Sequence, residues 1–453
     1  MSRTISPLPP IAAEELQHIG AGLRFLEAPT DYLVELRARH GDTFLLDVFG
    51  FELLMTFAPK GLESLYKLEE GQASFGLATY DLIGFKTPGE IFADADIALF
   101  YKLLANRAMP GYIALMDTLV DRELQRWGDA GELDIFDAIR TLEQRVGYGL
   151  WIAPEAADEP FWSELKRRFD VIDQERSFVD PQDVLATIKT GKARERAALD
   201  EIKKLLPAII AAHDSAADKS VATVDVLREH FAAEDAVTRE RKVAHSIVNI
   251  NQGFLSNLYA AIAWVVVRLL ADESVRARVQ SELDTVRAQF GAEFLRSPDA
   301  LNTLGYLEQV MMESVRLAQR SLTLRKVVQP LEFDDGATRY TVQPGVYIAT
   351  MLSVTNAQSG ELENFDPDRY VRNQLAPTQS LPGRETVSTF GHGRHACPAQ
   401  RFSHHMCKIV IAKLFERFEL RADSAGARPS SRQMGGVARA EGGVKVSYRR
   451  RAQ

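Results

Sequence analysis

Apolar residues recur at helical spacing through most of the middle of the chain. Apolar positions at i, i+3, i+4 and i+7 share one face of a helix, so each such stretch predicts an amphipathic helix. The stretches are residues 112–127, 135–152, 161–178, 181–213, 239–270, 272–290 and 302–319. Asp180 precedes Pro181 and has the chemistry of an N-cap for the fourth helix. Residues 215–224 are rich in Ser, Ala, Asp and Thr and predict a surface loop.

Two shorter regions have the composition of β-strands. Residues 43–57 place β-branched and aromatic residues around Gly50, which predicts a hairpin. Residues 327–333 and 339–352 predict a second hairpin, turned by Asp334-Asp335-Gly336. The fold class is therefore mostly α with small β sheets (α+β). No Pro/Gly/Ser-rich linker divides the chain, so we expect one domain over residues 1–453. Its β-rich part should cover about 40–60 and 320–355 plus C-terminal strands, and its helical part about 60–320 and 398–420.

Composition narrows the class of protein. The chain has 453 residues, 46% of them hydrophobic, which is enough to bury a large core. A formal net charge of -8 argues against a partner that is nucleic acid, because such proteins carry a basic excess. Residues 1–16 show neither a signal peptide nor a long apolar run, so we expect no membrane anchor, a cytoplasmic location and a monomer.

The chain has two cysteines, Cys397 and Cys407. A disulfide framework is implausible in a chain of this length, and two cysteines cannot form a four-thiolate metal site. A helical pattern follows Cys397 from residue 400 to 420, and Pro398 suits a first helical turn. The helix N-terminus would favour a thiolate, the kind of axial ligand that haem iron takes in oxygen-activating enzymes. Cys407, ten residues further on, lies about 15 Å away along a helix and is interpreted as core packing.

The residues around Cys397 resemble the cysteine-ligand loop of the cytochrome P450 family. The matching positions are Phe390, Gly393, His395, Cys397, Pro398 and Ala399, and Gly391 also lets the loop bend tightly. Ala399 stands where the family most often has Gly. The resemblance implies the cytochrome P450 fold and haem b (iron protoporphyrin IX) as cofactor, with Cys397 as the metal ligand. It assigns His395 to a haem propionate.

Two further motifs of the family follow the expected order. Glu313-Ser314-Val315-Arg316 matches its Glu-x-x-Arg signature, and Phe365-Asp366-Pro367-Asp368-Arg369 matches its Phe-x-Pro-x-Arg segment. The resemblance implies a buried structural network of Glu313, Arg316 and Arg369 that braces the cysteine loop. It also implies that Arg325 binds a propionate, with Lys102 and Tyr101 as weaker candidates.

The helix predicted over residues 239–270 departs from the family. Gly253, Asn257, Ala260 and Ala261 share one face, where small residues would leave room for a ligand above the iron. Ser256 and Asn257 align with the acid and the Thr that monooxygenases of the family usually carry here. No carboxylate lies between residues 245 and 271. With Asn257 at this place the helix resembles that of the sterol and bile-acid hydroxylases, and also that of prostacyclin synthase and the allene oxide synthases. We take Gly253, Ser256 and Asn257 as candidate catalytic residues.

Three functions are compatible with these features. The first is a monooxygenase that oxidises an apolar lipid, steroid, terpenoid or aromatic molecule with O2 and electrons from a ferredoxin and its ferredoxin reductase. A basic cluster near Cys397 would suit an acidic ferredoxin, although a solvated helix face explains it equally well; it comprises Arg394, His395, Arg401, His404, His405 and Lys408. The second is a peroxide-using isomerase, dehydratase or peroxygenase, and the third is a non-catalytic haem-binding protein. By analogy with the family, the expected pocket residues are Phe75, Leu77, Ile83, Phe85, Phe254 and Leu322.

Overall fold

The computed structural model describes residues 4–16, 18–82, 86–173, 181–217, 222–357, 360–377 and 381–452. The helices are α1 (Gly20–Glu27), α2 (Pro29–His40), α3 (Pro59–Lys67), α4 (Phe75–Leu82), α5 (Gly89–Ala93), α6 (Ile97–Leu103), α7 (Met109–Arg126), α8 (Ile135–Trp151), α9 (Phe161–Ile172), α11 (Pro181–Lys189), α12 (Ala193–Asp214), α13 (Thr223–His230), α14 (Ala236–Leu255), α15 (Leu258–Ala271), α16 (Glu273–Phe290), α17 (Pro298–Thr303), α18 (Gly305–Ala318), α19 (Leu352–Thr355) and α20 (Gln400–Arg417). The strands are β1 (Ile5–Ser6), β2 (Ile11–Ala12), β3 (Thr43–Val48), β4 (Phe51–Thr56), β5 (Ala73–Ser74), β6 (Ala130–Asp134), β7 (Leu322–Val327), β8 (Leu331–Asp334), β9 (Arg339–Val342), β10 (Tyr347–Met351), β11 (Tyr370–Val371), β12 (Gln374–Leu375), β13 (Phe418–Arg421) and β14 (Lys445–Arg450).

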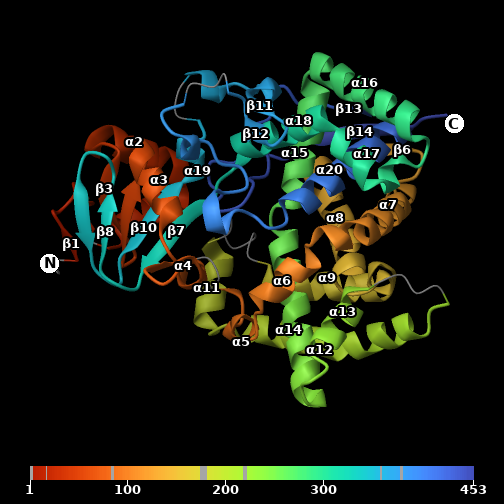
Figure 1. Ribbon diagram of the computed structural model, residues 1–453, viewed down its shortest axis with the longest axis horizontal. Helices are drawn as coiled ribbons and strands as arrows, with labels where there is room; N and C mark the ends of the chain where they lie inside the picture. The colour runs from red at the N-terminus through yellow and green to blue at the C-terminus, as the bar shows by residue number, and fades with distance from the viewer. Residues whose placement is uncertain are drawn as a thin grey trace.

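A β-rich part lies beside a larger helical part (Figure 1). Its main sheet has six strands in the order β2-β3-β4-β10-β7-β5. The predicted hairpin over 43–57 is confirmed as β3 and β4, which pair antiparallel. Phe49 and Gly50 turn it with φ of +54° and +88°, the left-handed values that a two-residue turn needs to match the twist of the strands.

The second predicted hairpin is only partly correct. β8 and β9 pair antiparallel around the predicted turn, in a sheet with β1. Val327 and the segment Tyr347–Met351 instead belong to β7 and β10 of the main sheet, where β10 pairs parallel with β4. The apolar residues of β10 are buried along the whole strand, so alternation along the chain could not show which sheet it joins.

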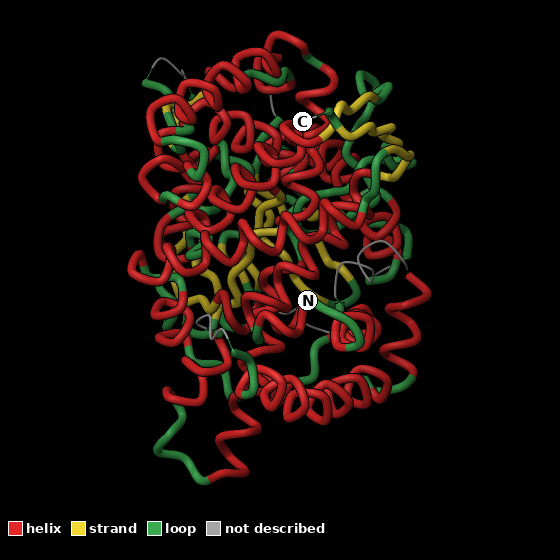
Figure 2. Tube along the Cα trace, turned by 90° about the vertical axis from the view of Figure 1, so that its right-hand side faces the viewer, coloured by secondary structure: helices red, strands yellow, loops and turns green. Residues whose placement is uncertain are grey.

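The helical part packs around α14 and α15, which run through its centre (Figure 1). Figure 2, viewed from that side, shows helices over most of the face and a small sheet near the C-terminus. This sheet has the order β13-β14-β6 and joins the end of the chain to the start of α8. Asp134 caps α8 by accepting from the N–H groups of Phe136 and Asp137, and it also accepts from the N–H of Val444.

Two predicted helices are each divided in the structure. The stretch 181–213 becomes α11 and α12, because Gly191 and Lys192 adopt φ of +54° and +64° between them. The stretch 239–270 becomes α14 and α15, broken at Ser256 and Asn257. Asp180 lies outside the described residues. Within those residues, Ala236–Ala271 alone is long and apolar enough to cross a membrane, but 67% of its most apolar window is buried inside the protein, as in a core helix.

Candidate functional site

The loop that carries Cys397 is held by its own backbone. Gly391 and Gly393 have φ of +79° and +65°, which Gly adopts at no steric cost. A Cβ atom at either position would lie 3.2 Å from a backbone carbonyl oxygen. The N–H of Cys397 donates to the carbonyl of Phe390 at 2.7 Å and closes the loop. Both glycines therefore permit the tight bend that the sequence predicts.

The helix that follows begins where the helical pattern begins, which leaves Pro398 outside it. α20 starts at Gln400 with Ala399 as its N-cap, so the prediction that Pro398 lies in the first helical turn is wrong. Burial raises the pKa of the Cys397 thiol, and the hydrogen bond from the Ala399 N–H lowers it by less. The helix N-terminus alone therefore does not make Cys397 a thiolate. A cation bound at the sulfur would do so, because a thiol that coordinates a metal is deprotonated.

Cys407 is fully buried within α20. Burial raises its pKa to about 12. It behaves as a small apolar residue, as the prediction of core packing states.

Arg325 is a buried cation with unused donors. Its side chain on β7 is only 1% exposed, and Nη1 donates to the carbonyl of Leu324 at 2.9 Å. Nε and Nη2 find no acceptor among the described residues. The guanidinium carbon lies 5.0 Å from the centre of the Phe75 ring, which lies 5.0 Å from the His395 ring. His395 Nε2 in turn lies 3.3 Å from Glu70 Oε2.

Burial changes the ionisation of this cluster. Burial lowers the pKa of Arg325, and the charge of Glu70 opposes this. Burial and the nearby Arg325 also lower the pKa of His395. A buried guanidinium with two unpaired nitrogen atoms is costly unless an anion meets it. A carboxylate from a bound molecule would satisfy Arg325, as a haem propionate is expected to do.

The other predicted propionate candidates lie on α6. Tyr101 is 56% exposed, and Lys102 is half-buried. Their role as propionate ligands stays a prediction.

The predicted network of Glu313, Arg316 and Arg369 is present. Arg316 donates from Nε and Nη2 to the two carboxylate oxygens of Glu313, each at 2.7 Å. Arg369 Nε donates to Glu313 Oε1 at 3.3 Å. The three side chains are at most 3% exposed. One carboxylate therefore serves two buried guanidinium groups, which is how a buried charge is tolerated.

Asn356 joins this network to the cysteine loop. Its amide nitrogen donates to the carbonyls of Arg316 at 3.1 Å and of Ser388 at 2.8 Å. Its amide oxygen accepts from the N–H of Ser388 at 2.8 Å. Ser388 lies two residues before Phe390, so Asn356 carries the restraint from the network to the loop of Cys397. No motif signals this residue, because its partners are backbone groups.

The predicted catalytic residues lie at the division between α14 and α15. Gly253 is exposed, and a Cβ atom there would meet nothing within 4 Å. Asn257 is the N-cap residue of α15, and its amide nitrogen donates to Ser256 Oγ at 2.9 Å. Its amide oxygen accepts from the N–H of Val437 at 2.9 Å. Ala260 and Ala261 are buried.

The predicted pocket residues that the structure describes lie on α4, β7 and α14, and α4 packs against β7. Phe75 belongs to the Arg325 cluster. Phe254 packs in the helical core, 5.6 Å from Phe402 between ring centres, and this does not support a pocket role. Leu77 is 49% exposed on α4, and Leu322 is half-buried on β7. Ile83 and Phe85 lie outside the described residues.

The predicted basic surface near Cys397 is largely wrong. His404, His405 and Lys408 on α20 are buried. Lys408 donates to Glu308 Oε2 at 2.6 Å and to the carbonyl of Leu301 at 2.9 Å. Burial would raise the pKa of Glu308, but the hydrogen bond from His404 and the charge of Lys408 outweigh it and hold the pKa at about 2. These side chains form an internal ionic cluster between α18 and α20.

Arg394 and Arg401 remain exposed. Arg394 is paired with Glu69 at 3.3 Å, and Arg401 donates to Asn106. The face near the cysteine loop therefore carries less free positive charge than the sequence implies.

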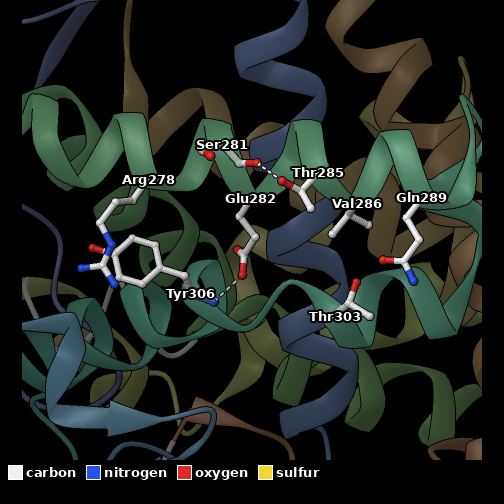
Figure 3. Close-up of a pocket in the computed structure, with 8 residues that line it drawn as sticks. All are labelled: Arg278, Ser281, Glu282, Thr285, Val286, Gln289, Thr303 and Tyr306. Carbon is white, nitrogen blue, oxygen red and sulfur yellow. Dashed lines mark hydrogen bonds between the residues drawn. The ribbon is translucent and has the colours of Figure 1, made fainter.

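A hollow on the outer surface lies between α16 and the start of α18 (Figure 3). Its lining comes from α16, α17 and α18 and includes nothing from the cysteine loop. Glu282 accepts there from the N–H groups of Tyr306 and Leu307 at 2.7 and 2.9 Å. Arg278 stacks 3.7 Å over the Tyr306 ring. These contacts cap the start of α18. The residues that line the hollow therefore have a structural role.

Comparison with known families identifies the chain. The sequence model of the family described as Cytochrome P450 matches residues 157–448. The chain belongs to the cytochrome P450 family. The predicted family, α+β fold class and haem b cofactor are confirmed by this match.

This cytochrome P450 is similar over nearly its whole length to proteins that act on sterols. The sterol 14alpha-demethylase of Mycolicibacterium vanbaalenii is 22% identical over 474 residues, with 99% of each chain covered. The 24-hydroxycholesterol 7-alpha-hydroxylase of Homo sapiens is 20% identical, over 98% of this chain and 94% of its own. The sterol 14-demethylase of Arabidopsis thaliana is 21% identical, over 98% and 92%.

The residues of this P450 fit its cofactor. Haem b carries two propionate carboxylates, and Arg325 offers a buried cation with two nitrogen atoms that have no acceptor in the described part of the chain. Haem iron needs a thiolate in this family, and Cys397 lies at the matching loop, where Gly391 and Gly393 allow the tight bend. The sequence did not reveal Phe75 between Arg325 and His395, nor Asn356, because both roles depend on contacts distant in sequence.

Proposed function

We propose that this cytochrome P450 is a monooxygenase that oxidises a steroid-like apolar molecule with O2 and electrons from separate donor proteins. The observation that carries the proposal is the buried cluster of Arg325 and His395 beside the loop of Cys397, which suits a thiolate-bound haem. Similarity over the whole chain to sterol demethylases and a hydroxycholesterol hydroxylase supports the substrate class.

In this proposal each residue has a stated task. The sulfur of Cys397 binds the iron, and Arg325 with His395 binds a propionate. Bound haem supplies the iron at which O2 is activated by added electrons. Gly253 leaves space on the distal helix, since its Cβ position has no neighbour within 4 Å among the described residues beyond the nearby turns of its own helix. The Ser256 hydroxyl, which can donate and accept, is the group on this helix that passes protons through water.

Electron transfer requires a separate protein in this proposal. Arg394 and Arg401 are the exposed cations of the cysteine-loop region that an acidic ferredoxin would meet. His404, His405 and Lys408 are buried and take no part. We therefore expect docking that weakens with salt, but less steeply than six exposed basic groups would give.

The test is oxidation of a sterol under defined electron supply. Purified protein, a ferredoxin, its reductase, NADPH and 24-hydroxycholesterol are incubated under 18O2, and products are analysed by mass spectrometry. Incorporation of one labelled oxygen only when reductant is present supports the proposal. A control with a long-chain fatty acid tests the substrate class. Turnover of the fatty acid alone would contradict the steroid assignment.

A second candidate function is rearrangement of a peroxide without external electrons. The observation that favours it is Asn257 on a distal helix without a carboxylate between residues 245 and 271. Ferric protein is mixed with a fatty-acid hydroperoxide in the absence of reductant. Rapid conversion, together with no reductant-dependent oxidation of any sterol, would replace the monooxygenase proposal by this one.

A further inference from the structure

Asn257 connects the distal helix to a loop from the C-terminal part of the chain. Its amide oxygen accepts from the N–H of Val437 at 2.9 Å, and its amide nitrogen donates to Ser256 Oγ at 2.9 Å. Val437 lies 180 residues further along the chain. Both ends of the amide are therefore used at the division between α14 and α15.

The loop of residues 435–438 is also bound to the segment that precedes β7. The N–H of Arg320 donates to the carbonyl of Gly436 at 2.8 Å, and the N–H of Gly435 donates to the carbonyl of Arg320 at 3.0 Å. The N–H of Ala438 donates to the carbonyl of Ala318 at 2.8 Å. The loop thus joins the N-cap residue of α15 to residues 318–320, which precede the strand of Leu322 and Arg325.

The same segment reaches the cysteine loop. Gln319 Nε2 donates to the carbonyl of Thr389 at 3.1 Å, and Thr389 precedes Phe390, whose carbonyl accepts from Cys397. A continuous series of hydrogen bonds therefore runs from Asn257 through the 435–438 loop to the Cys397 loop.

Gly436 is fitted against Asn257. It adopts φ of +62°, and a Cβ atom there would lie 2.5 Å from Asn257 Oδ1 and 3.3 Å from the carbonyl oxygen of Ser256. Any side chain at residue 436 would force the amide of Asn257 to turn away. The absence of a side chain at Gly436 and the hydrogen bond to Val437 are two independent signs that the contact is close.

We propose that Asn257 is a positioning residue that holds the 435–438 loop against the division of the distal helix and so fixes one wall of the substrate cavity. The proposal rests on the function proposed above, because it gives Asn257 a task in substrate placement. An amide suits this task because its oxygen accepts from Val437 while its nitrogen donates to Ser256. A group that only touches dioxygen or substrate would not need the bond to Val437.

The first test measures hydrogen exchange at the Val437 amide in the ferric, haem-loaded protein without substrate. Asn257→Leu keeps the size of the side chain but removes the acceptor, so exchange should accelerate about tenfold, the factor for one lost hydrogen bond. Gly436→Ala should give a similar acceleration by displacing the amide. Gly442→Ala is the matched control, because Gly442 has φ of +76° and nothing within 4 Å of its Cβ position.

The double variant Asn257→Leu with Gly436→Ala tests whether the two substitutions act through one shared contact or independently. If the two residues act through one contact, the double variant should exchange no faster than the faster single variant, since coupled residues are non-additive. Additive acceleration, or unchanged exchange in Asn257→Leu, would overturn the proposal.

The second test measures ligand affinity from the haem absorption shift. Imidazole is small and should bind to wild type and Asn257→Leu alike, whereas 4-phenylimidazole reaches the cavity wall and should bind several-fold more weakly to the variant. Equal weakening of both probes would indicate a direct role at the iron and contradict a positioning role. Because no turnover is needed, a failure to oxidise any sterol leaves both results interpretable.

Discussion

Substitution of Arg316 is expected to remove most of the restraint on the cysteine loop. Its side chain donates five hydrogen bonds, two to Glu313 and three to the carbonyls of Asn356, Leu362 and Asn364. A guanidinium has five N–H donors, so none remains unused. Arg316→Ala leaves Glu313 with Arg369 as its remaining ion-pair partner and removes three donors from backbone carbonyls.

The size of the effect follows from burial. Removing one partner of a buried ion pair costs about 3–5 kcal/mol, a large part of the roughly 5–15 kcal/mol that holds a folded domain together. Arg316→Lys keeps the charge but has three donors instead of five. Its free energy of unfolding should therefore lie between those of the wild type and Arg316→Ala. The exposed pair of Glu273 and Arg276 has the same i, i+3 spacing at 3.0 Å. Glu273 is 87% exposed there, so Arg276→Ala should cost at most about 1 kcal/mol.

The assay combines urea unfolding, followed by circular dichroism, with haem content from the carbon monoxide difference spectrum of the reduced protein. We expect Arg316→Ala to unfold at a much lower urea concentration and to retain little haem. Arg276→Ala should match the wild type in both. If Arg316→Ala holds normal haem and unfolds like Arg276→Ala, the bracing role of the network is refuted.

Three other outcomes are expected. Cys397→Ala should lose the thiolate-type carbon monoxide spectrum, and retention of that spectrum would exclude Cys397 as the ligand. Arg325→Gln should release haem to apomyoglobin faster than wild type, because it removes the buried cation, and an unchanged rate would argue against a propionate contact. Glu308 has a folded-state pKa of about 2 against an ordinary 4.5. This difference in pKa corresponds to a contribution of about 3 kcal/mol from ionised Glu308 to the stability of the folded state. The contribution should be complete above about pH 4.5 and should be lost as the pH falls towards 2. Glu308→Gln should therefore flatten this acid-induced loss in pH-dependent unfolding, whereas Glu416→Gln, half-exposed on α20, should leave it unchanged.

The elements formed by residues close together in the chain could be predicted from the sequence. The hairpin of β3 and β4 and the long helices follow from periodicity, because each element buries one face. The motifs around Glu313, Arg369 and Cys397 have fixed spacing, so their positions followed from the sequence. The predictions that were wrong concern features that depend on tertiary packing. His404 and Lys408 have polar side chains, yet α17 and α18 cover that side of α20, and only the fold shows it.

The place of Pro398 was mispredicted, because it precedes the first turn of α20. α20 begins at Gln400, as the helical pattern indicates, and burial of the Cys397 sulfur raises its pKa by more than the hydrogen bond from Ala399 lowers it. The division at Asn257 was equally hidden, since the contact made there, with Val437, is far away in the sequence. Periodicity reports which face of a helix is apolar, but not where a distant loop interrupts it.

The sheet of β13, β14 and β6 has a consequence for synthesis of the protein on the ribosome. Leu133 of β6 lies opposite Val446 of β14, 313 positions later. At about 5–20 residues per second, β6 emerges roughly 15–60 seconds before its partner strand exists. Throughout that interval its edge is open to chaperones and to wrong pairing. The loop of Cys397 emerges near the end of the same interval, so a haem bound through Cys397 can be inserted only after β6 has long been exposed.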